Sequence, residues 1–285
     1  MYSWNQVDQH WNLPPMEGAN KPIFLFACAW RSGSTLTQRL LCSSAEALIW
    51  GEPFAEAQII QSLAQSARYL LQNGGWESSF FPTRSIPKEA QERFFKTLKS
   101  KWIANVYPDP EHLRAAYRAL LDRLFAQPAY ELGFERFGIK AVRLSLEHAQ
   151  FLKWLYPDAR FVFLVRDPWR CWNSYCGNKW VYSWPNVYVE AALPFAKIWY
   201  RNTQQFLQWN DPSLLIMKYE DLLKDPKQTE RLRAHCELRE ILRGIFNQKI
   251  GGYNIQSKPV SSQDIKNILK VCKPLTERLG YSPPS

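Results

Sequence analysis

The sequence predicts an α/β fold: a P-loop-like three-layer domain with a mainly parallel central sheet and a helical insertion. Two observations lead to this prediction. Short apolar segments of strand length alternate with longer amphipathic segments of helical period along most of the 285 residues. Polar motifs directly follow several of the predicted strands, and the carboxyl ends of parallel strands are where such sheets bind ligands.

The first predicted strand is residues 23–28 (IFLFAC), an apolar run typical of a strand that is buried on both faces. The loop after it includes residues 31–35 (RSGST), and from Leu36 the apolar residues recur at helical spacing. A buried strand, a small-residue loop and a helix N-terminus can form a phosphate site, because backbone N–H groups and the helix dipole point at one spot. An ordinary strand–turn–helix unit has the same pattern and is the alternative.

The loop departs from the phosphate loop of nucleotide triphosphatases, which has the pattern G-x-x-x-x-G-K-[ST]. When that pattern is aligned on Gly33, Cys28 stands at the first glycine and Ser34 at the lysine. The missing lysine matters because it reaches the terminal phosphates of a triphosphate. The strong cation of this loop is instead Arg31, two residues before the glycine.

A second strand is predicted over residues 47–50 (ALIW), and the proline of residues 51–54 (GEPF) suits a turn after it. The simple alternation of strand and helix is then interrupted. Residues 55–135 are predicted as a helical insertion lying over the sheet, with amphipathic helices over residues 55–73, 87–102 and 111–125.

The rest of the chain restores the alternation and completes one domain over residues 1–285. Strands are predicted at 137–142, 160–165 and 214–217, and helices at 145–155, after Pro168, and from the loop at 177–186 to about 209. The last helix is expected to have Ser262 as its N-cap and to be interrupted by Pro274. Residues 1–21 are expected to form an irregular lead-in arm, whose Trp4 and Trp11 pack on the body or on a neighbouring subunit.

Composition narrows the class of protein. The net charge of +10 favours anionic ligands, yet the chain has no run of five or six basic residues, so we expect no nucleic-acid partner. The chain has no apolar run of 18 residues, and residues 1–20 lack the features of a signal peptide, so we expect no transmembrane segment. The six cysteines show no paired spacing and the four histidines are scattered, which favours reduced thiols, a cytoplasmic location and no metal site.

Two further motifs follow strands. Arg166-Asp167-Pro168 ends the strand at 160–165, and Ser174 stands eight residues after the arginine. An arginine at a strand end suits a bidentate phosphate contact, and Ser174 can reach the same phosphate if its helix runs beside the ligand. An Arg–Asp pair that ties down a loop is the alternative. After the strand at 214–217 come Tyr219 and the acidic pair Glu220-Asp221, which by themselves also suit the first turn of a helix.

Together the motifs resemble those of sulfotransferases that use 3′-phosphoadenosine 5′-phosphosulfate (PAPS), in the bacterial or tyrosylprotein-sulfotransferase-like branch. The resemblance covers about residues 22–281. It implies that the loop after the first strand binds the 5′-phosphosulfate, that the arginine and serine of the second motif bind the 3′-phosphate, and that the tyrosine contacts the adenine. The nucleotide-binding residues that it implies are Arg31, Ser32, Gly33, Ser34, Thr35, Arg166, Ser174, Tyr219 and, more weakly, Lys258.

The resemblance also implies a catalytic base, because a glycine–glutamate pair follows the second strand in this branch, where Gly51-Glu52 stands. Sulfuryl transfer needs the acceptor hydroxyl to lose its proton, and it needs positive charge on the bridging oxygen of the leaving phosphate. We therefore expect Glu52 as the base, Arg31 as the working cation and Lys140 as a second cation. A strand-end carboxylate that pairs a nearby arginine is the alternative for Glu52.

The implied function is transfer of a sulfuryl group from PAPS to a hydroxyl of a saccharide or small-metabolite acceptor, with 3′-phosphoadenosine 5′-phosphate (PAP) as product. The insertion at 55–135 is expected to contact the acceptor, and Trp180 and Trp184 are candidates for lining its site. The alternatives are a P-loop kinase, with Thr35 holding magnesium, and an inactive nucleotide-binding protein of the same fold. A homodimer is a further expectation that the sequence leaves open.

Overall fold

A computed structural model describes residues 4–16, 18, 20–52, 54, 57–72, 81–96, 106–177, 183–184, 187–247 and 261–284. At its centre is a five-stranded sheet with the strand order β2-β3-β1-β4-β7, in which every neighbouring pair is parallel. The expected α/β class is therefore confirmed. The strands are β1 (Ile23–Ala27), β2 (Ala47–Gly51), β3 (Arg136–Ala141), β4 (Arg160–Val165) and β7 (Leu214–Lys218).

The two faces of the sheet bury different side chains, because successive residues of a strand point to opposite faces. In β1, Phe24 and Phe26 join the larger core cluster, whereas Ile23 and Leu25 join the smaller one. The aromatic residues of β4 likewise lie on the side of the larger core. Both faces of the two central strands are fully buried, which explains why these strands read as continuous apolar runs.

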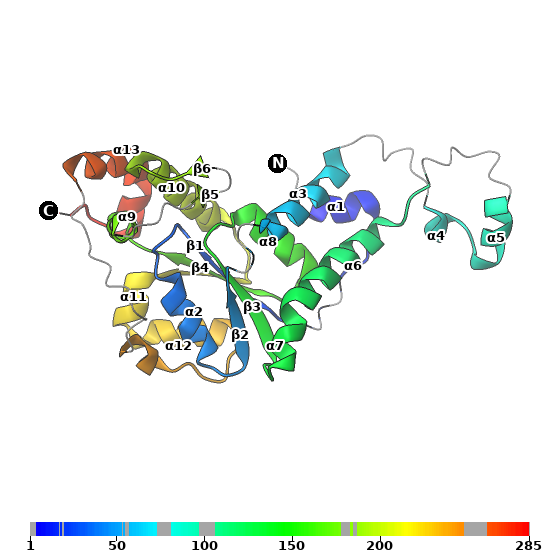
Figure 1. The fold of residues 1–285 in the computed structure, drawn as a ribbon, viewed down its shortest axis with the longest axis horizontal. Coiled ribbons are helices and arrows are strands. Elements are labelled where there is room, and N and C mark those ends of the chain that lie inside the picture. Colours follow the sequence, from blue (N-terminus) through cyan, green and yellow to red (C-terminus); the bar gives the residue numbers. More distant parts are fainter. Residues whose placement is uncertain are drawn as a thin grey trace.

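Helices cover both faces and give the three-layer architecture (Figure 1). On the smaller core lie α2 (Ser34–Cys42), α11 (Tyr219–Lys224) and α12 (Pro226–His235). On the larger core lie α8 (Leu146–Leu155), α9 (Pro168–Cys176), α10 (Ala192–Gln208) and α13 (Ser262–Leu279). A short antiparallel ribbon of β5 (Ser183–Trp184) and β6 (Val187–Tyr188) precedes α10.

The segment between β2 and β3 is helical in its described part. It contains α3 (Ile59–Gln72), α4 (Pro82–Ser85), α5 (Lys88–Lys96), α6 (Pro110–Leu121), the π-helical turn η5 (Asp122–Ala126) and α7 (Gln127–Glu131). Helices α3 and α6 pack against α8 on the larger core. In contrast, α4 and α5 lie at the end of the molecule farthest from α9 and α13 (Figure 1).

The N-terminal arm is not irregular as expected, because Trp4–Trp11 forms helix α1. Its expected packing on the body is confirmed: Trp11 is buried, and Trp4 stacks on Trp154 of α8 with ring centroids 5.1 Å apart. The helical period of this segment is weak in the sequence because it contains few apolar side chains. Packing on α8 supplies most of the stability of a helix this short.

The last helix corrects two further expectations. Its N-cap is Ser261, whose side chain accepts from the N–H of Asp264, and not Ser262. Pro274 does not interrupt α13, which runs through it to Leu279. Burial of Leu275 and Thr276 directly after the proline shows why: packing on the core offsets the backbone hydrogen bond that proline cannot make. The turn η6 (Arg243–Asn247) precedes this helix in the described chain.

Candidate functional site

The loop between β1 and α2 is held open by two residues with positive φ. Gly33, the N-cap of α2, has φ 91°, and Arg31 has φ 64°, both in the left-handed region. Because Gly33 has no side chain with which to cap the helix, the first N–H groups of α2 remain available to a ligand. Ser32 is fully buried, and its hydroxyl has no hydrogen-bond partner among the described residues. These unused donors fit a bound phosphate.

The next two loop residues differ in exposure. Ser34, the first residue of α2, is buried, whereas Thr35 is exposed. Thr37 is fully buried one turn into the helix, and its hydroxyl donates to the carbonyl of Gly33 at 3.3 Å. This bond fixes the start of the helix from the inside and leaves the outer side of the turn open.

Arg31 is the point where two distant motifs meet. Its Nε donates to Oγ of Ser174 at 3.2 Å, and its carbonyl accepts from Nη1 of Arg166 at 2.7 Å. Helix α9 starts directly after Arg166 and turns Ser174 back toward the loop. The arginine and serine of the second motif therefore lie beside the first loop, as a phosphate bound by both would require.

Tyr219 lies between Gly33 and Arg166. The guanidinium of Arg166 stacks over the tyrosine ring, 4.7 Å from its centroid. A Cβ atom on Gly33 would stand 2.1 Å from the ring, so only glycine fits at this position. Burial raises the pKa of Tyr219 above its usual value, so its hydroxyl stays protonated. The glycine of the first motif, the arginine of the second and the tyrosine of the third thus form one contact.

Asp167 caps helix α9 and does not pair with the arginine before it. Its carboxylate accepts from the N–H groups of Trp169 and Arg170 at 2.8 and 3.0 Å. Burial raises the pKa of Asp167, and nearby Glu220 adds to the effect. Glu220 in turn accepts from the N–H of Asp167 at 3.1 Å and from the hydroxyl of Tyr281 at 3.0 Å, which ties α11 to α9 and to the C-terminal residues.

Helix α10 supports the strand ends beneath the loop. Asn202 donates to the carbonyl of Cys28, and Trp199 donates to the carbonyl of Arg166, at 3.2 and 2.9 Å. Both side chains are fully buried. The thiol of Cys171 is fully buried against the same Arg166 carbonyl, and burial raises its pKa far above the usual range, so it stays protonated. These contacts fix the positions of the carboxyl ends of β1 and β4, from which the two loops begin.

On the other side of the loop, Glu52 forms an ion-paired cluster with two cations. Its carboxylate bonds Nζ of Lys140 through one oxygen and Nη1 of Arg143, at 2.9 Å, through the other. Lys140 is nearly buried on β3, and Glu52 follows β2 with φ 41°. The carboxylate pairs a nearby arginine, as the alternative for Glu52 expects, yet it also lies at the carboxyl edge of the sheet beside a pocket.

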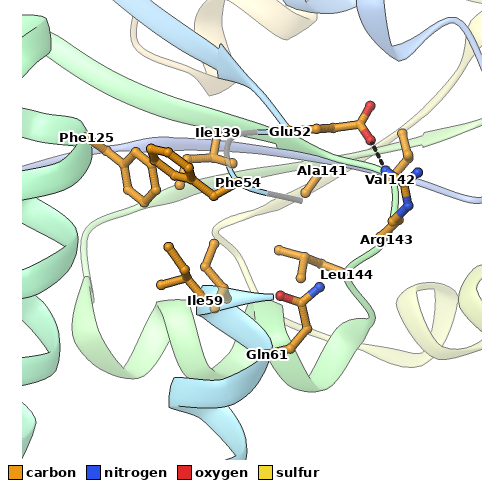
Figure 2. A pocket seen from close by; sticks show the side chains of 11 residues that line it. Glu52, Phe54, Ile59, Gln61, Phe125, Ile139, Ala141, Val142, Arg143 and Leu144 are labelled. Carbon is orange, nitrogen blue, oxygen red and sulfur yellow. Dashed lines mark hydrogen bonds and ion pairs between the residues drawn. The ribbon is translucent and has the colours of Figure 1, made fainter. Parts of the chain in front are cut away.

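That pocket opens between the ends of β2 and β3, the start of α3 and the turn η5. Its cavity volume is about 30 Å³, which is room for little more than one water molecule, and it opens to solvent. Figure 2 shows the carboxylate of Glu52 and the guanidinium of Arg143 together on one side, and the rings of Phe54 and Phe125 on the opposite side. The pocket is therefore apolar over most of its wall and charged at one end.

The strand order explains why these groups share one edge. All five strands are parallel, so the segments that follow them emerge on the same side. Neighbouring strands lie about 4.8 Å apart, which sets Glu52, Lys140, the loop at 28–35, Arg166 and Tyr219 in a row in that order. In the part of the chain that the structure describes, no three His, Cys, Asp or Glu side chains form a metal-binding group, and no helix could cross a membrane.

Sequence reasoning missed Arg143, the residues of the apolar pocket, and the supporting side chains of α10. The signal for Arg143 was present, because it stands two residues after the buried strand β3, much as Arg166 stands one residue after β4. Lys258 and Trp180 lie outside the described residues, and Trp184 is described by its backbone alone. The remaining predicted site residues, which the structure describes, lie at the carboxyl edge of the sheet.

A family model described as "Sulfotransferase family" matches residues 22–241. No curated protein matches the chain. Similar solved structures include sulfotransferase domains of the curacin biosynthetic pathway and of the Synechococcus PCC 7002 olefin synthase. Both are 16% identical, with TM-scores of 0.47 and 0.48; the alignments cover 94% and 96% of this chain and 100% and 99% of theirs. A mouse sulfotransferase complexed with PAP is 13% identical, with a TM-score of 0.39, over 81% of this chain and 63% of its own.

Proposed function

Because the chain belongs to the sulfotransferase family, whose model matches residues 22–241, we propose that it transfers a sulfuryl group from PAPS to an acceptor hydroxyl and releases PAP. The acceptor belongs to the wide class of saccharides and small metabolites, and the helical segment at 55–135 contacts it. The six scattered cysteines, which are free thiols, fit the cytoplasmic location that we also propose.

The observation that carries the proposal is the row of groups along the carboxyl edge of the sheet. At one end, Tyr219 and Arg166 offer an aromatic ring for the adenine and a guanidinium for the 3′-phosphate. In the middle, the loop at 28–35 offers backbone donors for the 5′-phosphosulfate. At the other end, Lys140 and Glu52 stand beside the position of the sulfuryl group. This order follows the order of chemical groups along PAPS.

The residues at that end supply the chemistry. Glu52 accepts the proton of the acceptor hydroxyl while the acceptor oxygen forms its bond to sulfur. The bond between sulfur and the bridging oxygen breaks, and its electron pair stays on the phosphate of PAP. Arg31 and Lys140 supply positive charge to that oxygen. Glu52 can act although it is paired, because an ionised carboxylate has about four acceptor positions and its two partners use only some of them.

A thermal-shift comparison of PAP with ATP tests the donor assignment on the full chain. A ligand that binds the folded state raises the melting temperature in proportion to the logarithm of its concentration over its Kd, so PAP should stabilise more than ATP does. Arg166→Ala should remove most of the shift given by PAP. A larger shift with magnesium and ATP would overturn the proposal and favour a P-loop kinase with Thr35 at the metal.

The inactive nucleotide-binding protein is the second alternative, and a transfer assay separates it from the proposed enzyme. Radiolabelled PAPS should release PAP and label an acceptor when a panel of phenols, alkyl alcohols and sugars is supplied. Tight binding of PAP without labelling of any acceptor, under conditions in which PAPS remains intact, would favour the inactive alternative.

A further inference from the structure

A second cavity lies at the edge of the sheet opposite to the candidate site. Its wall comes from α1, from the C-terminal half of α8 and from the segment that leads into β7, and its volume is about 390 Å³. Pro157 and Asp211 in this wall each stand three residues before a strand, β4 and β7 respectively. Because the strands are parallel, their amino ends share this edge, whereas Arg31, Arg166 and Tyr219 follow the carboxyl ends. A cavity of this size is usual for a small-molecule site.

Tryptophan rings supply much of the apolar part of the wall. Trp4 of α1 and Trp209 after α10 are half-buried, and Trp154 of α8 is buried. Trp4 stacks on Trp154, and the guanidinium of Arg114 lies over the same Trp154 ring, 5.6 Å from its centroid. Trp154 therefore supports the wall from within, and Trp4 and Trp209 keep surface that a ligand can cover.

The charged side chains of the wall neutralise one another. Nη1 of Arg114 lies 3.1 Å from Oδ1 of Asp8, and Nζ of Lys153 lies 3.7 Å from Oδ1 of Asp211. Among the described lining residues these are the charged ones, so the wall carries no net charge. An anion would meet two carboxylates, and a cation would meet a guanidinium and an ammonium group. The wall therefore favours a ligand without net charge.

Hydrogen-bonding groups remain for such a ligand. The hydrogen bonds that the described residues make to the side chains of Asp8 and Asp211 all reach Oδ1, which leaves Oδ2 of each as an acceptor. The amide of Gln150 and the indole N–H groups of Trp4 and Trp209 have no hydrogen-bond partner in the described part of the chain. The wall thus offers both donors and acceptors, and they come from separate segments.

A pyranose ring matches this combination of groups. Its hydroxyls both donate and accept, as the carboxylate oxygens, the amide and the indole N–H groups together require. Its C–H face is apolar and can lie flat on an indole ring. A flat aromatic or alkyl ligand would also cover the rings, but it would leave the carboxylate oxygens without donors, which costs free energy. An organic cation would suit the indoles, but Arg114 and Lys153 would repel it.

We propose that this cavity is a non-catalytic binding site for a neutral saccharide. A pyranose ring lies against Trp4 and Trp209, and its hydroxyls bind the free oxygens of the two aspartates and the amide of Gln150. The inference goes beyond the proposed function, because the cavity lies at the edge of the sheet away from the groups assigned to PAPS and does not depend on that donor.

Titration calorimetry of the full chain with cellobiose, sorbitol and choline chloride tests the ligand class. Cellobiose has flat pyranose rings and should bind with a Kd of ~1 mM or lower. Sorbitol carries similar hydroxyls on an open chain without a ring face, so it should bind at least tenfold more weakly. Choline tests the preference for a cation. Absence of cellobiose binding at ten times the expected Kd, or equal or tighter binding of sorbitol or choline, would overturn the inference.

Variants locate the binding to the cavity. Gln150→Ala removes one free amide and should raise the Kd for cellobiose about three- to tenfold, the contribution of a hydrogen bond. Gln65→Ala is the matched control: this glutamine is exposed on helix α3, outside the cavity, and its loss should leave that Kd unchanged. Trp4→Leu keeps an apolar contact with Trp154 but removes the ring, and it should raise the Kd about tenfold. Equal Kd values for Gln150→Ala and Gln65→Ala would overturn the assignment of the cavity.

Saturating PAP separates this site from the acceptor site. Because the two sites lie at opposite edges of the sheet, the Kd for cellobiose should stay within about twofold when PAP is bound. A larger change would place the sugar beside the nucleotide and overturn the inference, while the sulfotransferase assignment would stand. Failure to bind PAP rejects the proposed function, whatever cellobiose does.

Discussion

Glu52 has the most informative side chain of the candidate site, because the structure gives it two partners that compete with a catalytic role. The salt bridges to Lys140 and Arg143 occupy part of the hydrogen-bonding capacity of this carboxylate. An acceptor hydroxyl therefore has to share the carboxylate with these two cations. A catalytic base and a purely structural ion-pair partner predict different outcomes when glutamine replaces Glu52, which removes the charge and keeps the shape.

Glu52→Gln should lower kcat by 10²-fold or more and leave the Kd for PAP within a factor of three. A general base contributes about 10²–10⁴-fold, and a carboxamide cannot accept the proton. The measurement is steady-state kinetics with a PAP titration on the same preparation. Glu147→Gln is the control. It removes the ion pair of Glu147 with Arg68, which are 2.8 Å apart and lie outside the site, and it should keep full activity. Retained turnover in Glu52→Gln would remove Glu52 as the base.

At the scale of single elements, helix α10 supports the two phosphate loops, a role that its sequence pattern does not indicate. Most of its buried side chains simply pack, but Asn202 and Trp199, three residues apart on one face, hold the carbonyls at the ends of β1 and β4. The Arg166 carbonyl also accepts from the thiol of Cys171, whereas loss of the Asn202 bond removes the side-chain partner of the Cys28 carbonyl, and an unsatisfied buried carbonyl costs about 1–3 kcal/mol. Because these carbonyls precede the phosphate loops, we expect the cost to appear in nucleotide binding as well as in stability.

Asn202→Ala should weaken binding of PAP about five- to tenfold and lower the melting temperature by several degrees. The neighbouring Thr203→Val is the matched control, since this hydroxyl is equally buried and has no hydrogen-bond partner among the described residues. Thr203→Val should leave the Kd for PAP unchanged. Calorimetric titration of PAP measures both; an Asn202→Ala variant with lower stability but unaltered affinity would show that the residue only packs.

The first turn of helix α8 contains His148, which makes stability depend on pH. Nδ1 of His148 accepts from the N–H of Ser145 at 3.0 Å, so the cap requires the neutral ring. The pKa of His148 is lowered to about 4, chiefly by burial; Glu147 opposes the shift, and Arg68 and Arg201 add to it. The folded pKa lies below the unfolded value of about 6.5, so stability is complete above pH 6.5 and falls as the pH drops toward 4.

Urea unfolding at pH 7 and pH 5 measures this effect. The wild-type protein should lose on the order of 1–3 kcal/mol between these values, and His148→Gln, which can still cap but cannot take a proton, should lose clearly less. Glu237 does not confuse the comparison, because its pKa is lowered to about 2 by Arg160 and Lys21 and it titrates below pH 4.5. His235, whose pKa burial also lowers, contributes equally to both proteins. Identical losses would rule out His148 as the source.

At the scale of the whole molecule, one carboxylate joins the N-terminal helix, the segment between β2 and β3, and α8. Asp8 of α1 accepts from Nη1 of Arg114 on α6 at 3.1 Å and from the indole of Trp154 on α8 at 2.6 Å. The Arg114 side chain is only 2% exposed and stacks over Trp154, 5.6 Å from its ring. Three segments far apart in the chain therefore depend on one charge pair, whose arginine is buried and whose aspartate is partly exposed.

Asp8→Ala should lower the free energy of unfolding by about 3 kcal/mol, because it removes the carboxylate partner of the buried Arg114 guanidinium. For a chain of this size that corresponds to a fall of about 6–12 °C in Tm. Lys21→Ala is the contrast: it breaks a pair of similar length with Glu237 whose side chains are half exposed, and it should cost under 1 kcal/mol. Adding Arg114→Leu to Asp8→Ala should restore part of the loss. Equal effects of Asp8→Ala and Lys21→Ala would contradict this account.

The sequence by itself determined the α/β class and the positions of the candidate site residues. Strand β1, the glycine at 33, the arginine at 166 and the tyrosine at 219 could be located because apolar period and turn chemistry are local properties of a chain. The N-terminal helix, the true N-cap Ser261 and the passage of α13 through Pro274 could not, because packing on the core decided them against local preference.

Only the tertiary structure decided which of these places meet. The order β2-β3-β1-β4-β7 is set by pairing between strands far apart in the chain, such as Ile23 of β1 with Arg160 of β4, and no local pattern encodes it. That order brings Ser174 to Arg31, sets Tyr219 against Gly33, and pairs Glu52 with Arg143 across the edge of two strands. The apolar pocket arises in the same way, since its wall is shared by β3, α3 and η5. Each of these residues can be identified from the sequence by itself, but the strand order of the sheet brings them together into a site.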